Sequence, residues 1–367
     1  MGIGNPVAYR QIVKIVLALS LCFSISHEAA AQDKTIDSIA REYQIKDGPG
    51  FSLAVVHKGE LVFKNGYGLA DVKNTVAIEA DSSFRLASVT KQFTALCIAM
   101  LAERGKLKFD DDITLYLKVP WKGVTIQHLV YHTSGVPDYI DMMYKNWKQK
   151  KRPVNADAIR LFTQYKMKLD FAPGKKHEYS NTGYILLASI IEKVSGMTFP
   201  KFMQENIFTP LKMKHSVVWT PTAKIHKRVF GYSKRRRAKK FRLDDEDMVN
   251  DFYGDGAIYS TAEDMAKWAA ALYMNSTKLV KKKMWKHIFT SGKLNNGKDI
   301  GYGFGWSIYP LYKRYGEALT SHSGSWVGFN TYIAIYPQRD LCIIILSNNA
   351  SLKIYKLTEK IDKLYPK

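Results

Sequence analysis

The chain has 367 residues, of which 46% are hydrophobic, 13% aromatic and 24% charged, and these proportions exclude a disordered, collagen-like or coiled-coil protein. The net charge of +22 favours anionic surroundings such as nucleic acid, phospholipid or cell-wall polymer, although it specifies no fold. Three Cys residues are too few for a disulfide-rich scaffold.

The first 31 residues have the parts of a secretory signal peptide. Arg10 and Lys14 precede a short apolar stretch, and the small residues 29–31 offer a cleavage site. An uncleaved membrane anchor is the alternative, but the apolar run is shorter than the ~20 residues of a spanning helix. We therefore expect a signal peptide over 1–31, cleavage near Ala31–Gln32, a periplasmic or secreted protein, and no stable membrane span after cleavage.

The two ends of the remaining chain carry the patterns of one sheet. Apolar residues at helical spacing predict a helix that ends before residues 48–50. Residues 51–57 and 61–65 then predict a hairpin. Near the C-terminus, three strands are predicted over 302–309, 329–336 and 341–347, followed by a closing amphipathic helix at 354–364.

Residues 85–290 have mostly helical patterns. We therefore expect an α/β (α+β) fold with an antiparallel five-stranded sheet, terminal helices flanking it and an inserted helical lobe. The expected catalytic domain spans 32–367, with a sheet lobe at about 32–84 and 291–367 and a helical lobe at about 85–290.

The segment Lys234–Arg242 holds seven basic residues in nine, and four acidic residues follow it. A solvated loop with compensating acids is the plain interpretation. An anionic envelope polymer is the alternative partner. A secretion signal and the absence of a recognisable binding module argue against nucleic acid.

Ser88-Val89-Thr90-Lys91 opens a long helical pattern. Residues three apart share a helix face, so Lys91 can reach the Ser88 hydroxyl. The positive end of the helix dipole favours a developing oxyanion at Ser88, and a neutral lysine amine can accept its proton. This motif is weak alone, because chance or a helix cap also explains it.

Two triplets make the pattern more specific. Tyr179-Ser180-Asn181 precedes an apolar helix, where a tyrosine can transfer protons and an asparagine can orient a substrate amide. His322-Ser323-Gly324 lies ahead of the strand predicted at 329–336, with Ser325 next. Glycine allows close backbone approach, and the Ser325 N–H can stabilise an oxyanion.

These motifs together resemble the serine β-lactamase and penicillin-binding-protein superfamily, in its branch of class C β-lactamases and DD-peptidases. The resemblance extends over about residues 35–350. It implies that Ser88 is acylated, Lys91 accepts its proton and Tyr179 serves the leaving group. It also implies that Asn181 holds the substrate amide, that the backbone N–H groups of Ser88 and Ser325 form the oxyanion hole, and that residues 322–325 bind substrate.

His322 departs from the family pattern, since most β-lactamases of the superfamily have lysine there. Lysine is cationic near neutral pH, whereas an ordinary histidine titrates in the working range. We therefore expect a weaker or pH-dependent clamp for a substrate carboxylate.

The resulting hypothesis is an exported acyl-serine hydrolase acting on a β-lactam, a peptidoglycan stem peptide or an ester. The alternatives are a D-Ala–D-Ala carboxypeptidase or esterase without useful β-lactamase activity, and a non-catalytic cell-wall-binding relative. The chain has no G-x-S-x-G elbow, which argues against a different hydrolase fold. It has no metal-ligand spacing such as H-E-x-x-H, so we expect no metal, and we also expect no cofactor.

Overall fold

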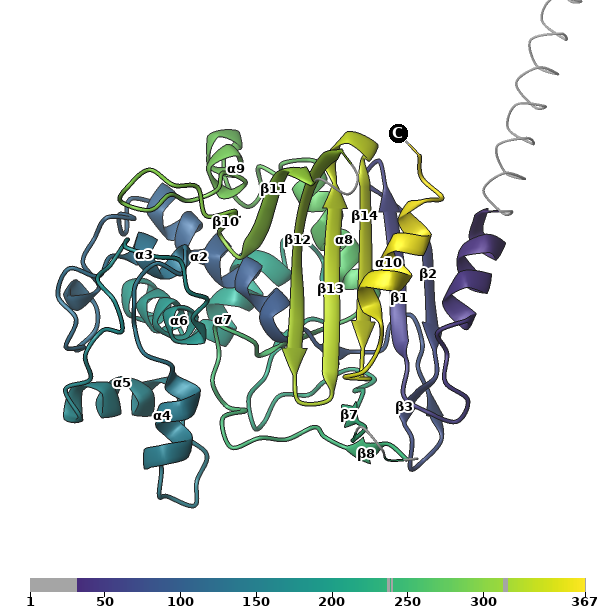
Figure 1. Cartoon of the computed structure of the whole chain (residues 1–367), viewed down its shortest axis with the longest axis horizontal. Helices are drawn as coiled ribbons and strands as arrows, with labels where there is room; N and C mark the ends of the chain where they lie inside the picture. The colour runs from purple at the N-terminus through teal and green to yellow at the C-terminus, as the bar shows by residue number, and fades with distance from the viewer. Residues whose placement is uncertain (1–31, 236–237, 239, 313–315, 367) are drawn as a thin grey trace, which may run out of the picture.

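The computed structural model describes residues 32–235, 238, 240–312 and 316–366, so the predicted signal peptide lies outside the described residues. A seven-stranded antiparallel sheet forms one side of the molecule (Figure 1). Its spatial order is β10-β11-β12-β13-β14-β1-β2. The strands are β1 (Phe51–His57), β2 (Glu60–Tyr67), β10 (Tyr302–Gly303), β11 (Trp306–Tyr312), β12 (Glu317–Trp326), β13 (Phe329–Tyr336) and β14 (Leu341–Ser347).

The prediction of an antiparallel sheet is confirmed, but the prediction of five strands was wrong. The range 302–309 contains two strands, β10 and β11. Strand β12 was not predicted, and His322-Ser323-Gly324 lies within it rather than ahead of a strand. Its polar residues have little strand propensity, so pairing with β11 and β13 on its two sides determines its conformation.

Each face of the sheet packs on its own apolar core. Alternate residues of β1 point to opposite faces, so Ala54 and Val56 join one core and Leu53 and Val55 the other. Helix α8 packs on β1, β2 and β14, whereas α10 packs on β13 and β14. In Figure 1 these two helices lie on opposite faces of the sheet, and the helix at residues 32–41 lies beside β2.

Most helices lie in the segment between β2 and β10 and gather beside the sheet (Figure 1). The helices are η1 (Ala87–Thr90), α2 (Lys91–Glu103), η2 (Ile113–Leu115), α3 (Ile126–Val130), α4 (Tyr139–Asn146), α5 (Asn155–Gln164), α6 (Asn181–Ser195), α7 (Phe199–Met203), η3 (Gln204–Phe208), α8 (Ala262–Tyr273), α9 (Lys282–Ile288), η4 (Pro337–Arg339) and α10 (Ile354–Asp362). Short strands complete the chain: β3 (Leu69–Asp71), β4 (Val76–Ala77), β5 (Phe84–Arg85), β6 (Val217–Val218), β7 (Tyr232–Ser233), β8 (Arg242–Leu243) and β9 (Ile258–Ser260).

Helix α2 is the central helix of this lobe, since its residues from Lys91 to Leu101 are all buried. It contacts α6, which begins at a capped turn where the Ser180 hydroxyl accepts the Gly183 N–H. Within the described residues, no helix has both the length and the apolar character needed to cross a bilayer.

Candidate active site

Ser88 lies in the 3-10 turn η1, directly ahead of α2, and its side chain is half-buried. The preceding Ala87 has φ 49°, a left-handed conformation that costs a non-glycine residue ~1–3 kcal/mol. Strands β12 and β13 hold this turn from one side: the Thr331 hydroxyl donates to the Leu86 carbonyl at 2.7 Å. A Cβ added at Gly324 would lie 2.3 Å from that same carbonyl oxygen, so only glycine allows the approach.

Lys91 is the first residue of α2 and is fully buried. Its Nζ lies 3.1 Å from Ser88 Oγ, 2.8 Å from Asn181 Oδ1 and 2.9 Å from the carbonyl oxygen of Asp255. The rings of Tyr179 and Tyr184 lie 4.9 Å and 5.5 Å from it. Oxygen acceptors and aromatic rings therefore surround the amine.

Tyr179 and Asn181 flank the N-cap of α6. Asn181 is bound to Lys91, whereas the side chain of Tyr179 is 44% exposed. The Tyr179 ring is packed 4.3 Å, centroid to centroid, from the ring of His132. A half-buried amide and an accessible phenol thus lie on the two sides of one turn.

His132 is a fully buried residue beside Tyr179. Its Nδ1 accepts the N–H of Ser180 at 3.0 Å, so the ring proton of the neutral form is on Nε2. Burial, and then the charge of Lys91, hold the pKa of His132 well below its ordinary value. This neutral ring positions the turn that carries Tyr179 and Asn181.

His322 lies on β12 and is 5% exposed. The Tyr302 hydroxyl donates to Nε2 at 3.0 Å, and Nδ1–H donates to the Ser323 carbonyl at 2.6 Å, which satisfies a neutral ring. Burial first, and the charge of Lys91 second, lower the pKa of His322 to about 3. Of the weaker or pH-dependent clamp expected at His322, the buried and already hydrogen-bonded ring favours the weaker clamp.

The low pKa of His322 predicts a specific acid sensitivity. Below about pH 6.5 the unfolded chain binds a proton at this residue that the folded chain excludes until about pH 3, so the free energy of unfolding falls by ~1.4 kcal/mol per pH unit. Urea unfolding of wild type and His322→Gln, measured near pH 7 and pH 5, should show a loss ~2 kcal/mol smaller in the variant. If wild type and variant lose equal unfolding free energy between pH 7 and pH 5, His322 is not held neutral in the folded protein.

These residues surround a cavity of about 460 Å³. Pairing between β11 and β12 ends at Ser307 and Ser321, so the following residues of β12 border the cavity. The lining residues are Ser88, His177, Tyr179, Asn181, Tyr302, Ser307, His322, Ser323 and Ser325.

The structure thus brings together the residues predicted from sequence. Lys91 lies behind Ser88, and Gly324 lies against η1, so neither lines the cavity. Sequence reasoning missed His177, Tyr302 and Ser307 as lining residues. His177 could have been found only from its position two residues before Tyr179, and no local pattern indicates Ser307. Across the described ranges, no group of three or more His, Cys, Asp and Glu side chains is placed to hold a metal ion.

A family model described as "Beta-lactamase" matches residues 36–357. The chain belongs to the Beta-lactamase family. This confirms the resemblance to the serine β-lactamase and penicillin-binding-protein superfamily, while its assignment to the class C branch stays a prediction.

Curated relatives agree with the family. The chain is 34% identical to "Penicillin-binding protein 4*" of Bacillus subtilis over 79% of this chain and 66% of the relative. It is 26% identical to "Beta-lactamase" of Escherichia coli over 90% of this chain and 93% of the relative. It spans only about two thirds of the first of these, and 65% of "Protein flp" of Staphylococcus aureus.

Solved structures of the superfamily share the fold. A penicillin-binding protein from Bacillus halodurans gives a TM-score of 0.75 at 27% identity and covers 90% of this chain and 99% of that chain. An octameric penicillin-binding protein homologue from Pyrococcus abyssi gives the same TM-score and identity, covering 90% of this chain and 77% of that chain.

Proposed function

We propose that this Beta-lactamase family member is an exported serine hydrolase that cleaves amide or ester bonds through an acyl-enzyme. The observation that carries the proposal is the buried Lys91 amine 3.1 Å from Ser88 Oγ at an open cavity. Relatives named as a penicillin-binding protein and as a β-lactamase support the same chemistry. We further propose that residues 32–367 form one catalytic domain.

The partners of Lys91 suit a proton acceptor. The oxygens of Asn181 Oδ1 and the Asp255 carbonyl can only accept, so both take N–H groups from Lys91. In the charged form a third N–H of Lys91 donates to Ser88 Oγ. When Lys91 is neutral, its lone pair takes this place and faces Ser88, whose O–H then donates to it. When Ser88 Oγ bonds to a substrate carbonyl carbon, its proton moves to Lys91 Nζ.

The remaining roles follow from the cavity lining. The backbone N–H groups of Ser88 and Ser325 stabilise the oxyanion, and the Asn181 NH₂ donates to the substrate amide. Tyr179 gives a proton to the leaving group as its bond to the carbonyl carbon breaks, and the proton that Lys91 took from Ser88 returns to the Tyr179 oxygen. Water then attacks the acyl carbon, the bond between that carbon and Ser88 Oγ breaks, and one water proton restores the Ser88 hydroxyl as the acid is released.

The neutral His322 bears on the substrate class. Without a cation at this position, a substrate carboxylate loses a charge-assisted hydrogen bond. The proposal therefore places esters and neutral amides ahead of β-lactams and D-Ala–D-Ala peptides, which carry that carboxylate. A penicillin-binding carboxypeptidase is the second candidate, because a relative 34% identical carries the name of a penicillin-binding protein.

Intact-protein mass spectrometry tests the proposal. The chain is mixed with a penicillin, an activated aryl ester and a D-alanyl-D-alanine peptide in parallel, and both adduct mass and product release are followed. An acyl adduct or turnover with any of the three supports a serine hydrolase. If all three remain intact and no adduct forms, the non-catalytic alternative takes its place.

Replacing His322 with lysine should raise β-lactam acylation by about 10- to 100-fold, because a charged hydrogen bond contributes ~1.5–3 kcal/mol. The second-order acylation rate for a penicillin measures this effect. An ester without a carboxylate should gain nothing, and His322→Gln, which adds no charge, should leave the penicillin rate low. An equal gain for both substrates would show that the added charge does not act on the carboxylate.

We also propose that the protein is exported and that its basic segment contacts an anionic polymer. Export depends on residues 1–31, and the N-terminal sequence of the secreted protein tests it. An anionic-polymer contact at Lys234–Arg242 is supported by charge alone; residues 236, 237 and 239 lie outside the described residues. Within this segment, Arg242 lies 3.9 Å from Asp244, as a loop with compensating acids requires.

A further inference from the structure

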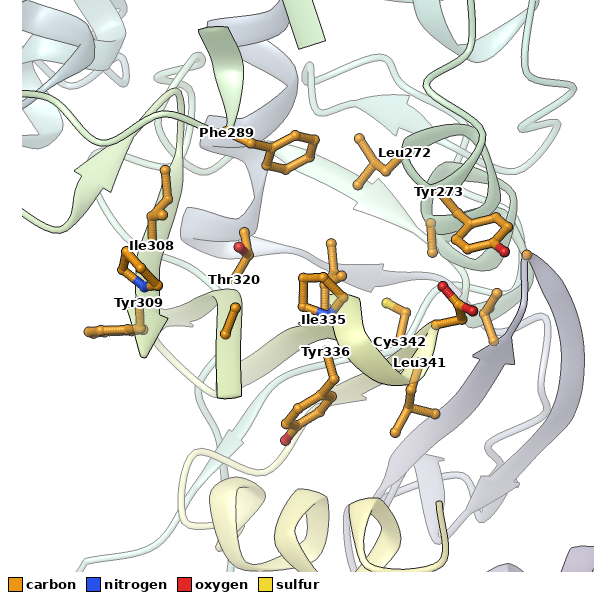
Figure 2. Close-up of a pocket in the computed structure, with 17 residues that line it drawn as sticks. Leu272, Tyr273, Phe289, Ile308, Tyr309, Thr320, Ile335, Tyr336, Leu341 and Cys342 are labelled. Atoms are coloured by element: carbon orange, nitrogen blue, oxygen red, sulfur yellow. The ribbon is translucent and has the colours of Figure 1, made fainter. Parts of the chain in front are cut away.

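A second cavity lies on the α8 side of the sheet and shares no lining residue with the catalytic cavity. Its volume is about 510 Å³, within the ~300–1,000 Å³ range of small-molecule sites. The 17 residues drawn in Figure 2 come from the end of β1, the β1–β2 turn, α8, the residue after α9, β11 to β13, η4 with the residue after it, and the start of β14. Several separate elements therefore build one chamber.

The walls of this second cavity are apolar. Leu272 and Phe289 lie across it from Thr320 and Ile335 (Figure 2). Ala269, Ile308, Val56 and Cys342 add further apolar surface. Water gains few hydrogen bonds in such a space, whereas an aliphatic chain buries its own surface there.

Charge at the rim selects the polar end of the ligand. Asp340 is the single carboxylate among the lining residues, and none of them is Lys or Arg although the chain has 55 such residues. Within the described part of the chain, Asp340 has no ion-pair partner. Tyr273, which also lines the cavity, is 46% exposed and offers its ring to a cation.

We propose that this cavity binds a single-chain amphiphile with a cationic head group. The alkyl chain lies between α8 and the sheet, and the head group lies at Asp340 beside the Tyr273 ring. A carboxylate head would meet Asp340 as a like charge. This inference is independent of the hydrolase proposal, since it uses neither Ser88 nor the catalytic cavity.

Calorimetric titration of the chain with octyl-, decyl- and dodecyltrimethylammonium, each below its micelle concentration, tests the site. We expect one molecule per chain, with a dissociation constant that falls about fourfold per added methylene. Alkyl carboxylates of equal length should bind several-fold more weakly. Absence of saturable binding, or equal binding of the two head groups, would overturn the proposal.

Variants separate this site from general surfactant binding. Ala269→Phe fills the cavity and should abolish binding, whereas Ala77→Phe makes the same change at an exposed position and should not. Asp340→Asn should bind both head groups equally, and asparagine tolerates the left-handed φ of 47° at this position. This second variant tests the head-group preference even if Ala269→Phe does not fold. If Ala269→Phe and Asp340→Asn both bind the alkyltrimethylammonium ions as wild type does, this cavity is not the binding site.

Discussion

Ser88→Ala is expected to abolish acyl-adduct formation and to lower turnover of every accepted substrate by at least ~10⁴-fold. The substitution removes the hydroxyl oxygen that lies 3.1 Å from the Lys91 amine. It leaves the backbone N–H of residue 88 in place, so substrate binding should persist. Rates at saturating substrate and intact mass after exposure to an activated ester measure the two effects.

Ser189→Ala is the matched control for this experiment. Ser189 lies on α6, the helix that begins at Asn181, and its hydroxyl donates to the Ile185 carbonyl of its own helix. Its removal should leave acylation unchanged. An adduct that survives in Ser88→Ala would place the nucleophile elsewhere, and peptide mapping of that adduct would identify it.

The parts of the fold that the sequence predicted are those whose residues carry the signal themselves. Strands β1 and β14 are nearly continuous apolar runs, and α10 has a clear apolar stripe, so their positions were evident. Strand β12 lacks such a pattern, because its residues are mostly serine, threonine, histidine and glycine. Its two neighbours in the sheet determine its conformation, and they come from other parts of the chain.

The same distinction separates the predicted from the missed features of the site. Ser88 and Lys91 are three residues apart, so a local helical turn was sufficient to pair them. The Asp255 carbonyl that binds Lys91 is a backbone group from a distant loop, and no residue type announces it. The protonation of His322 depends likewise on burial and on the Tyr302 hydroxyl, which only the folded chain brings together.

Lys91→Met is expected to lower the acylation rate by at least ~10³-fold while the substrate still binds. Methionine has nearly the same length but cannot take the Ser88 proton. Since Ser88 and Lys91 act in one step, the double variant with Ser88→Ala should be hardly slower than Ser88→Ala alone. Stopped-flow acylation rates for the three variants measure this non-additivity.

The loss of folding stability in Lys91→Met must be separated from its loss of acylation rate. The variant removes a buried amine but leaves Asn181 Oδ1 and the Asp255 carbonyl without their donor, at ~1–3 kcal/mol for each group. Urea unfolding measures this loss, and Lys193→Met on exposed α6 surface provides the control for the substitution itself. A folded Lys91→Met protein that acylates at the wild-type rate would show that another group accepts the Ser88 proton. The histidines nearest to the amine would then be the groups to test, although burial holds the pKa of both His132 and His322 below the ordinary value.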